Sequence, residues 1–385
     1  MFPLARLPEE WATEVVRLGG RAFHGKQVFK WIHARGVADA SKMTDLPAGL
    51  RDTLSAEGLE GVLGIVTERR AADQTRKLLV GMKDGANVET VLIPRVSGGR
   101  RGELPSPLEE DADVAAAVDD EDAPPEDEGA VVPVTQCIST QVGCAMGCVF
   151  CASGVAGLKR HMRADEIVAQ VLVGRTRLDA GEQIRNVVFM GMGEPLHNYD
   201  ATVRALRLLT HPEGIGLSTR KVTVSTSGLV PEIARLGADF NGQIGLAISL
   251  HAADDETRSR LMPINKKYPL PVLMDALRAY PLPRRRRITI EYTLVAGKND
   301  GPGEAKKLAK LLRGLSVKVN LIPMNPIEAS TLGPPDLGGV LAFQKILVDA
   351  GYSCFIRRRR GDDVSAACGQ LALLGAKPKV RVDRS

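Results

Sequence analysis

The sequence predicts an α/β fold, an open or partial (β/α) barrel, because strand-like and helix-like segments alternate along most of the chain. Between residues 131 and 360, short apolar runs alternate with amphipathic stretches of helical period. Such alternation is typical of parallel strands joined by helical crossovers. The strand-like runs are almost continuously apolar, as expected when both faces of a sheet are covered. With 385 residues, the chain is long enough for one large domain and an appendage.

The strands and helices of the barrel can be placed by their sequence patterns. Strands are predicted at 131–139, 186–191, 221–226, 244–250, 287–294, 318–323 and 354–357. Helices are predicted between them at 164–178, 200–210, 270–280, 303–315 and 340–350. In a barrel of this kind, the chemistry gathers at the C-terminal ends of the strands. Functional residues are therefore expected just after these runs.

Two smaller segments precede the barrel. Residues 1–75 are predicted to form a helical accessory domain that could hold RNA. Within it, FHGKQVFKWIHARGV (23–37) has apolar residues near helical spacing with basic residues between them. That pattern fits an RNA-facing helix and an ordinary amphipathic helix equally well. A β-hairpin extension is predicted at 76–102, because KLLVGMK and NVETVLIP flank the turn dipeptide Asp84-Gly85.

An unusual acidic stretch interrupts the chain at residues 103–130, with twelve Asp and Glu residues and no Lys or Arg. A stretch so acidic and so rich in Pro and Ala is expected to be a disordered insertion outside the fold. The whole chain carries a net charge of +5, so the remainder is strongly basic. Such a charge favours a polyanionic partner such as RNA over a merely solvated surface. The barrel is predicted at 131–375, and a tail at 376–385.

The chain shows no sign of a membrane or secretory protein. No apolar run reaches the length needed to cross a bilayer, and the N-terminus lacks a basic-then-apolar signal pattern. We therefore expect a cytoplasmic protein without a membrane partner, and we expect a monomer. In that compartment, six cysteines are more typical of metal binding or catalysis than of a disulfide scaffold.

A cysteine cluster follows the first predicted barrel strand. Cys144, Cys148 and Cys151 form the pattern C-x3-C-x2-C. Three thiolates this close can bind three corners of a [4Fe–4S] cube and leave one iron open. The same spacing also describes one face of a helix, so a buried apolar cluster is an alternative. Zinc with His161 as fourth ligand is another, although zinc motifs usually come as two separated couples.

C-x3-C-x2-C after a strand resembles the signature of the radical S-adenosylmethionine (SAM) enzymes, whose fold is a partial (β/α)6-type barrel. Three more motifs, GMGEP (191–195), STSG (225–228) and SLHA (249–252), match that family in order at successive strand ends. Alone, each could be a tight turn or a common polar strand end. The resemblance implies that SAM is bound by Gly193, Glu194, Ser225, Ser249, Leu250, His251 and Asn325.

Nearly the whole chain is similar to the RlmN/Cfr family within these enzymes, and most of all to its adenine-C2 branch. The segment RRRRGDDVSAACGQL (357–371) carries much of the likeness. The resemblance implies methylation of adenine C2 in 23S rRNA, at the peptidyl transferase centre, and of the adenine 3′ to the anticodon in tRNA. Methylation at C8, as in the Cfr branch, is the alternative within the family. A zinc-stabilised RNA-binding protein without catalysis is the alternative of another class.

The resemblance also implies roles for three residues outside the cluster. Cys368 would take a methyl group from one SAM, and cleavage of a second SAM, driven by an external electron donor, would start the radical reaction. Glu89 would remove the C2 proton, and Cys137 would release the RNA by forming a disulfide with Cys368. Pattern alone makes Glu89 an outward-facing strand residue and Cys368 a small buried hydrophobe. Cys354 matches no motif, and we interpret it as a small buried hydrophobe.

Overall fold

The structure is a computed structural model, which describes residues 2–59, 63–95, 131–327, 330–357, 360–361, 364–366 and 369–371. The predicted acidic insertion at 103–130 and the predicted tail at 376–385 lie outside these residues, and so does Cys368. The structure does not test the predicted domain boundaries, which remain predictions.

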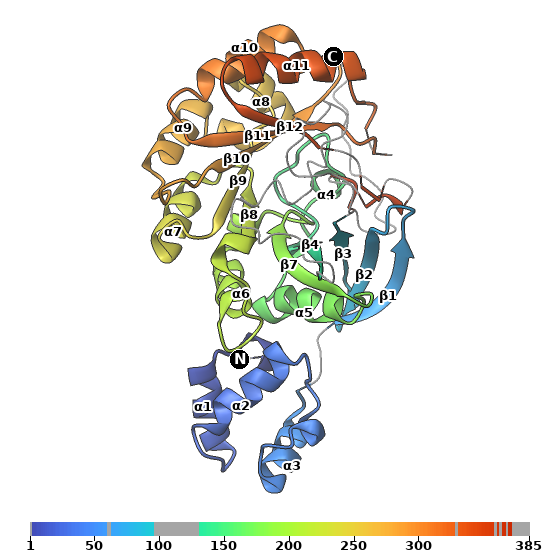
Figure 1. Ribbon diagram of the computed structural model, residues 1–385, viewed down its shortest axis with the longest axis vertical. Helices are drawn as coiled ribbons and strands as arrows, with labels where there is room; N and C mark the ends of the chain where they lie inside the picture. The colour runs from blue at the N-terminus through green and yellow to red at the C-terminus, as the bar shows by residue number, and fades with distance from the viewer. Residues whose placement is uncertain are drawn as a thin grey trace.

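A mixed sheet of ten strands forms the centre of the described chain, in the order β1-β2-β3-β4-β7-β8-β9-β10-β11-β12 (Figure 1). From β4 to β12, every neighbouring pair is parallel. These parallel strands are β4 (Val132–Cys137), β7 (Glu182–Phe189), β8 (Val222–Thr226), β9 (Gly245–Ser249), β10 (Ile288–Leu294), β11 (Val317–Pro323) and β12 (Ser353–Ile356). Each predicted barrel strand is present, and the predicted α/β class is confirmed.

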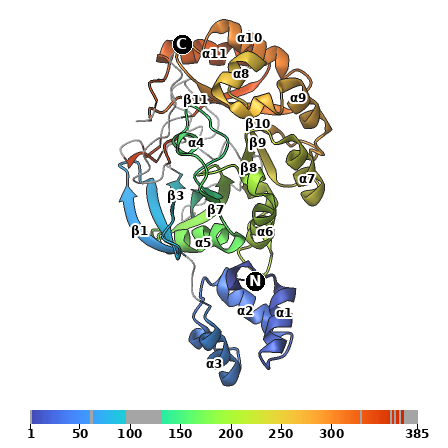
Figure 2. The same cartoon turned by 180° about the vertical axis from the view of Figure 1, so that it is seen from behind.

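Helices connect the parallel strands and cover one face of the sheet (Figures 1 and 2). They are α5 (Ala164–Arg175), α6 (Tyr199–Thr210), α7 (Val230–Phe240), α8 (Asp255–Leu261), α9 (Leu270–Ala279), α10 (Pro302–Leu311) and α11 (Leu337–Asp349). The sequence prediction did not place α7 or α8. Helix α7 contains a helix-weakening glycine, Gly237, which the fold needs because an added Cβ would lie 2.7 Å from Cδ of Pro281.

Three antiparallel strands extend the sheet beyond β4: β1 (Leu63–Arg70), β2 (Arg76–Met82) and β3 (Asn87–Pro94). Strands β2 and β3 form the predicted hairpin around Asp84-Gly85. Strand β1 falls within the segment 1–75 that was predicted to be helical, so that prediction is wrong for these residues. The reason is that β1 is an exposed edge strand ending in TERR, and its sequence therefore lacks the apolar alternation of a covered strand.

The N-terminal helices α1 (Pro8–Arg17), α2 (His24–Phe29) and α3 (Ala48–Glu57) lie together beyond α5 and α6, at the end of the molecule opposite to α10 and α11 (Figures 1 and 2). The predicted amphipathic helix corresponds to α2 and a π-helical turn, η2 (Lys30–Ala34). Its apolar side, which includes Phe29, is buried. On its basic side, Lys26 and Lys30 pair with Glu213 at 3.7 and 3.4 Å.

The register of the sheet separates an apolar face from a polar one, because paired residues on neighbouring strands point to the same side. The apolar face packs under the helices and includes Val187, Val222, Leu246, Ile290 and Val319. The opposite face lines the inside of the partial barrel and carries Cys137, Thr223, Ser225, Ser249, Glu291 and Asn320. A buried face this polar is built for a ligand rather than for a core. None of the described helices is long and apolar enough to cross a bilayer.

Close packing of α1 on α2 gives a stability prediction. A Cβ at Gly25 would overlap the backbone of Ala12, so Gly25→Ala should lower the free energy of unfolding by about 1–3 kcal/mol. Urea unfolding checks this. Gly49→Ala in α3 is the matched control, since a Cβ there meets no atom within 4 Å and should be neutral or slightly stabilising. Equal effects of the two substitutions would contradict the packing argument.

Candidate active site

The cysteine loop runs from the end of β5 (Gln141–Val142) to the short helix α4 (Ala152–Ala156). Cys144 is buried, and Cys148 and Cys151 are partly buried. The backbone N–H of Cys144 donates to the carbonyl of Gly157 at 3.2 Å, and that of Cys151 donates to the carbonyl of Cys148 at 3.2 Å. The loop is thus closed on itself, with the thiols at its start, middle and end.

The thiols lie close enough to influence one another electrostatically. Burial, together with the nearby Cys151 and Glu194, raises the pKa of Cys144 to about 12. Burial also raises the pKa of Cys148, with further contributions from Cys151, Cys144 and Glu194. Without a cation, these thiols are therefore held in the protonated form. Bound iron would supply the positive charge that makes three neighbouring thiolates favourable.

The donor set fits an iron–sulfur cube. Within the part of the chain that the structure describes, no three His, Cys, Asp or Glu side chains converge as they would around one metal ion. Thiolates that bind a cube attach to three different iron atoms, so they need not converge on one point. Cys144, Cys148 and Cys151 supply three soft ligands on one closed loop, which is the chemistry such a cluster requires.

Glu194 lies where two strand-end loops meet. Its carboxylate accepts hydrogen bonds from the backbone N–H groups of Leu196 at 3.1 Å and Ser227 at 2.7 Å. Burial raises the pKa of Glu194, and the hydrogen bonds from Ser227 and Leu196 oppose that rise. Its neighbour Gly193 has φ of +103°, and a Cβ there would lie 2.6 Å from the side chain of Gln141. The loop GMGEP is therefore more than a tight turn, because it fixes a buried carboxylate beside the cysteines.

Ser225 and Ser249 lie side by side on the inner face, with their Oγ atoms 3.4 Å apart. The next strand-end residue, Leu250, is buried. Asn325 is buried just beyond the end of β11. The structure therefore places these predicted SAM contacts at the C-terminal ends of β8, β9 and β11.

His251 connects β9 to the cysteine loop. It has φ of +55°, and its Nδ1 accepts a hydrogen bond from the backbone N–H of Thr293 at 2.8 Å. Burial lowers the pKa of His251 to about 3, so the ring is neutral and its proton is on Nε2. The edge of the ring packs against Phe150, which lies between two cluster cysteines, with the centroids 4.9 Å apart. The ring thus supports the cysteine loop.

Sequence reasoning missed Arg258, a fully buried arginine in α8. Its guanidinium donates to the carbonyl oxygens of Leu250 at 3.0 Å, Ser227 at 2.7 Å and Ser249 at 3.3 Å, and to Oδ1 of Asn265 at 2.8 Å. One side chain therefore joins the STSG and SLHA loops. An arginine in the polar stretch DETRSRL gives no signal of burial, so no pattern in the sequence would have found it.

Cys137 and Glu89 lie on neighbouring antiparallel strands and point to the same face. In the register of β3 and β4, Cys137 pairs with Val91, and Glu89 is two residues along from Val91. Glu89 and Cys137 are therefore diagonal neighbours on the inner face. Glu89 is 5% exposed, and its carboxylate forms an ion pair with Lys77 at 3.0 Å. The interpretation of Glu89 as an outward-facing surface residue is thus wrong.

The structure describes the chain on both sides of Cys368 but not Cys368 itself. After it, the carbonyl of Gly369 accepts from the backbone N–H of Ala152 at 2.9 Å, and that of Leu371 accepts from Oγ of Ser153 at 2.6 Å. Both donors belong to α4, directly after Cys151. The described residues that follow Cys368 are therefore attached to the helix at the end of the cysteine loop.

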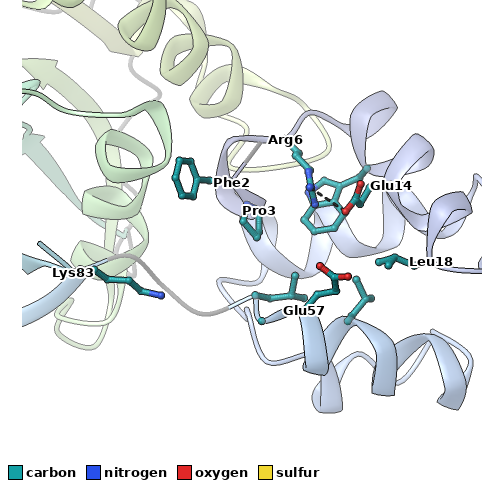
Figure 3. A pocket seen from close by; sticks show the side chains of 11 residues that line it. Phe2, Pro3, Arg6, Glu14, Leu18, Glu57 and Lys83 are labelled. Atoms are coloured by element: carbon teal, nitrogen blue, oxygen red, sulfur yellow. Dashed lines mark ion pairs between the residues drawn. The ribbon is translucent and has the colours of Figure 1, made fainter.

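A separate pocket of about 320 Å³ lies far from these residues, between the N-terminal helices and the turn of the β2–β3 hairpin (Figure 3). Phe2, Pro3 and the paired Arg6 and Glu14 line it, and Lys83 reaches toward it from the hairpin. None of the predicted site residues lines this pocket. We therefore assign the chemistry to the inner face of the barrel and not to this hollow.

Comparisons with known proteins agree with the geometry. Residues 138–312 match the radical SAM superfamily, and residues 9–58 match the N-terminal domain of the ribosomal RNA large subunit methyltransferases. The chain is 70% identical to a dual-specificity RNA methyltransferase RlmN of Sorangium cellulosum, over 99% of this chain and 98% of the relative. It is 43% identical to the protein of the same name from Syntrophobacter fumaroxidans, over 96% of each.

A solved structure is also similar over nearly the full length. The crystal structure of a radical SAM methyltransferase from Sphaerobacter thermophilus superimposes with a TM-score of 0.81 at 39% identity. The match covers 96% of this chain and 98% of that one.

The cysteine loop predicts which substitutions abolish iron binding. After anaerobic reconstitution with iron and sulfide, the protein should contain iron and labile sulfide and absorb visible light broadly. Cys148→Ala should lose most of that iron. Cys354→Ala, at the buried position of strand β12, is the matched control and should retain it. Iron and sulfide analysis and the visible spectrum are the measurements, and wild-type iron content in Cys148→Ala would remove this residue from the ligand set.

Proposed function

Since this chain belongs to the RlmN family of radical SAM RNA methyltransferases, we propose that it methylates C2 of adenine in 23S rRNA and in tRNA. The proposed positions are an adenine of the peptidyl transferase centre and the adenine 3′ to the anticodon. The full-length relatives carry the name dual-specificity RNA methyltransferase, which supports two RNA substrates. The observation that carries the proposal is the position of Glu89 and Cys137 on one inner face, next to the strands that carry the SAM motifs.

The substrate explains the need for a radical. C2 of adenine lies between two ring nitrogens and is electron-poor, so it does not attack the sulfonium methyl of SAM. When bound to Cys144, Cys148 and Cys151, a [4Fe–4S] cluster with an open iron supplies the one-electron reduction of SAM that starts radical chemistry. In the proposed site, Glu194 accepts a hydrogen bond from the ammonium group of SAM. Ser225, Ser249, Leu250, His251 and Asn325 surround the rest of the ligand.

Three side chains complete the proposed reaction: one carries the methyl group, one removes a proton and one releases the product. The thiolate of Cys368 attacks the methyl carbon of one SAM, becomes a thioether and releases S-adenosylhomocysteine, and a second SAM is consumed in activating the methyl group. Two SAM molecules are therefore used per turnover. Once the activated carbon has bonded to C2, Glu89 removes the C2 proton. Cys137 then attacks the sulfur of Cys368, so that an S–S bond forms and the C–S bond breaks. The carbon left on the base takes up a proton to become a methyl group, and the one surplus electron passes to an external electron acceptor.

The reaction implies partners and a setting. An electron donor must reduce the cluster, and thiol–disulfide exchange must restore Cys137 and Cys368 after each turnover. We place the protein in the cytoplasm, where its RNA substrates are, and propose that it acts as a monomer. The basic charge of the chain supports binding of RNA through phosphate contacts, which position the RNA before a base is flipped out of its stack.

The two alternatives are less well supported. The relatives from Sorangium and Syntrophobacter both carry the name RlmN, so methylation at C8 is not favoured. Membership of a catalytic superfamily also argues against a zinc-stabilised RNA-binding protein without activity.

Nucleoside mass spectrometry tests the position of methylation. RNA from a deletion strain complemented with this chain should contain 2-methyladenosine, and RNA from the uncomplemented strain should not. The Cys368→Ala variant is the control and should restore nothing. Appearance of 8-methyladenosine instead of 2-methyladenosine would replace the proposed reaction with the C8 alternative.

The resolving role of Cys137 predicts a trapped adduct. In Cys137→Ala, no thiol attacks Cys368, so the RNA should stay covalently bound and shift the protein band on a denaturing gel. Nuclease treatment should abolish the gel shift. A small mass increment should then remain on the peptide that contains Cys368. Cys354→Ala is the control and should show no adduct. Normal turnover by Cys137→Ala would show that another group resolves the intermediate.

A further inference from the structure

Lys77 of β2 contacts two groups that are far apart in the sequence. Its Nζ lies 3.0 Å from Oε1 of Glu89, and it donates a hydrogen bond to the carbonyl oxygen of Ser365 at 3.1 Å. Ser365 is three residues before Cys368. One ammonium group therefore joins the proposed base to the segment that carries the proposed methyl carrier.

The sheet register places Lys77 on the same face as the reacting residues. Lys77 pairs with Val91 across β2 and β3, and Val91 pairs with Cys137 across β3 and β4. The three residues form one row on the inner face, and Glu89 is the diagonal neighbour of both Lys77 and Cys137. The ion pair therefore lies beside the proposed resolving thiol and within the proposed active site.

Burial distinguishes this ion pair from an ordinary surface pair. The side chain of Lys77 is 11% exposed and that of Glu89 is 7% exposed. Exposed pairs contribute little because water and salt screen them. A pair this buried fixes both side chains, and loss of Lys77 removes a buried positive charge from beside the carboxylate of Glu89.

The residues on both sides of Cys368 are attached to other parts of the proposed active site. Before Cys368, the chain is attached to Lys77 through Ser365, and after it, Gly369 is attached to Ala152 of α4. The described residues on either side of the proposed methyl carrier are thus attached to Lys77 and to the cysteine loop. The ammonium group of Lys77 therefore contacts both the carboxylate of Glu89 and the backbone that precedes Cys368.

We propose that Lys77 is a positioning residue for proton removal, and that it aligns the carboxylate of Glu89 with C2 of the adenine. This inference rests on the proposed function. Lys77 acts through Glu89 and does not itself exchange a proton with the substrate. Its loss therefore slows the removal of the C2 proton while the earlier transfer of a methyl group to Cys368 continues.

Three substitutions at Lys77 test the proposal. Lys77→Met removes the charge and the donor, Lys77→Gln keeps a donor for Ser365 without the charge, and Lys77→Arg keeps the charge. Lys345→Met is the matched control, because that lysine forms an exposed ion pair with Asp349 at 2.9 Å on α11. Each variant is first reconstituted and checked for wild-type iron content, and Lys77→Gln replaces Lys77→Met if the latter does not fold.

Two readouts separate positioning from a purely structural role. The first is methylation of Cys368, measured by peptide mass after one turnover without RNA. The second is the isotope effect on methyl-RNA formation when the target adenine carries deuterium at C2. We expect Lys77→Met to load the methyl group normally, to form product on the order of tenfold more slowly or worse, and to show a larger isotope effect than the wild type. Lys77→Arg should restore much of the rate, and Lys345→Met should match the wild type.

The opposite results overturn the inference. If Lys77→Met does not methylate Cys368, the lysine is needed to fold or dock the segment and not to align the base. If it loads the methyl group but its isotope effect equals that of the wild type, the slow step is not proton removal. Failure of the proposed function is distinguishable, because the wild-type protein itself would then form no 2-methyladenosine and Cys137→Ala would trap no RNA.

Discussion

The alternation of side chains along the strands is the constraint on which the site depends. Since successive residues of a strand point to opposite faces, a register shift of one residue would move Cys137, Ser225 and Ser249 from the inner face to the helix-covered face. The apolar residues between them prevent this shift, because they must stay under the helices. The packing of the core therefore fixes the strand register, and the register in turn fixes the positions of the residues on the inner face.

Electrostatics is the second constraint, and it explains why the loops need internal support. Cys144, Cys148 and Glu194 are all buried, and burial disfavours the charged form of each. Backbone N–H donors support Glu194, and the neighbouring Arg258 lowers the pKa of Cys148 against the effect of burial. The site is thus suited to a positively charged ligand, since iron and a sulfonium group would stabilise the negatively charged forms of these thiols and of this carboxylate.

Local patterns predicted a large share of this architecture. The parallel strands were predictable because covered strands are continuous apolar runs, and the cysteine loop because its spacing is short. Strand β1 was missed because an exposed edge strand carries no apolar period. The burial of Arg258 and the contact of Lys77 with Ser365 depend on segments that folding brings together, and such contacts leave no trace in a single sequence. The roles of the site residues depended on family resemblance and remain proposals.

The contact between Lys77 and Ser365 has a consequence for biosynthesis. The two residues are separated by 288 positions, so the contact cannot form until the chain has been synthesised as far as Ser365 and this residue has left the ribosome. The cysteine loop and the early strands emerge much sooner. A nascent chain could therefore fold its early strands, with Glu89 and Cys137, while still lacking the cysteine that is proposed to carry the methyl group. Synthesis of the segment around Ser365 would then be the event that completes the surroundings of Glu89.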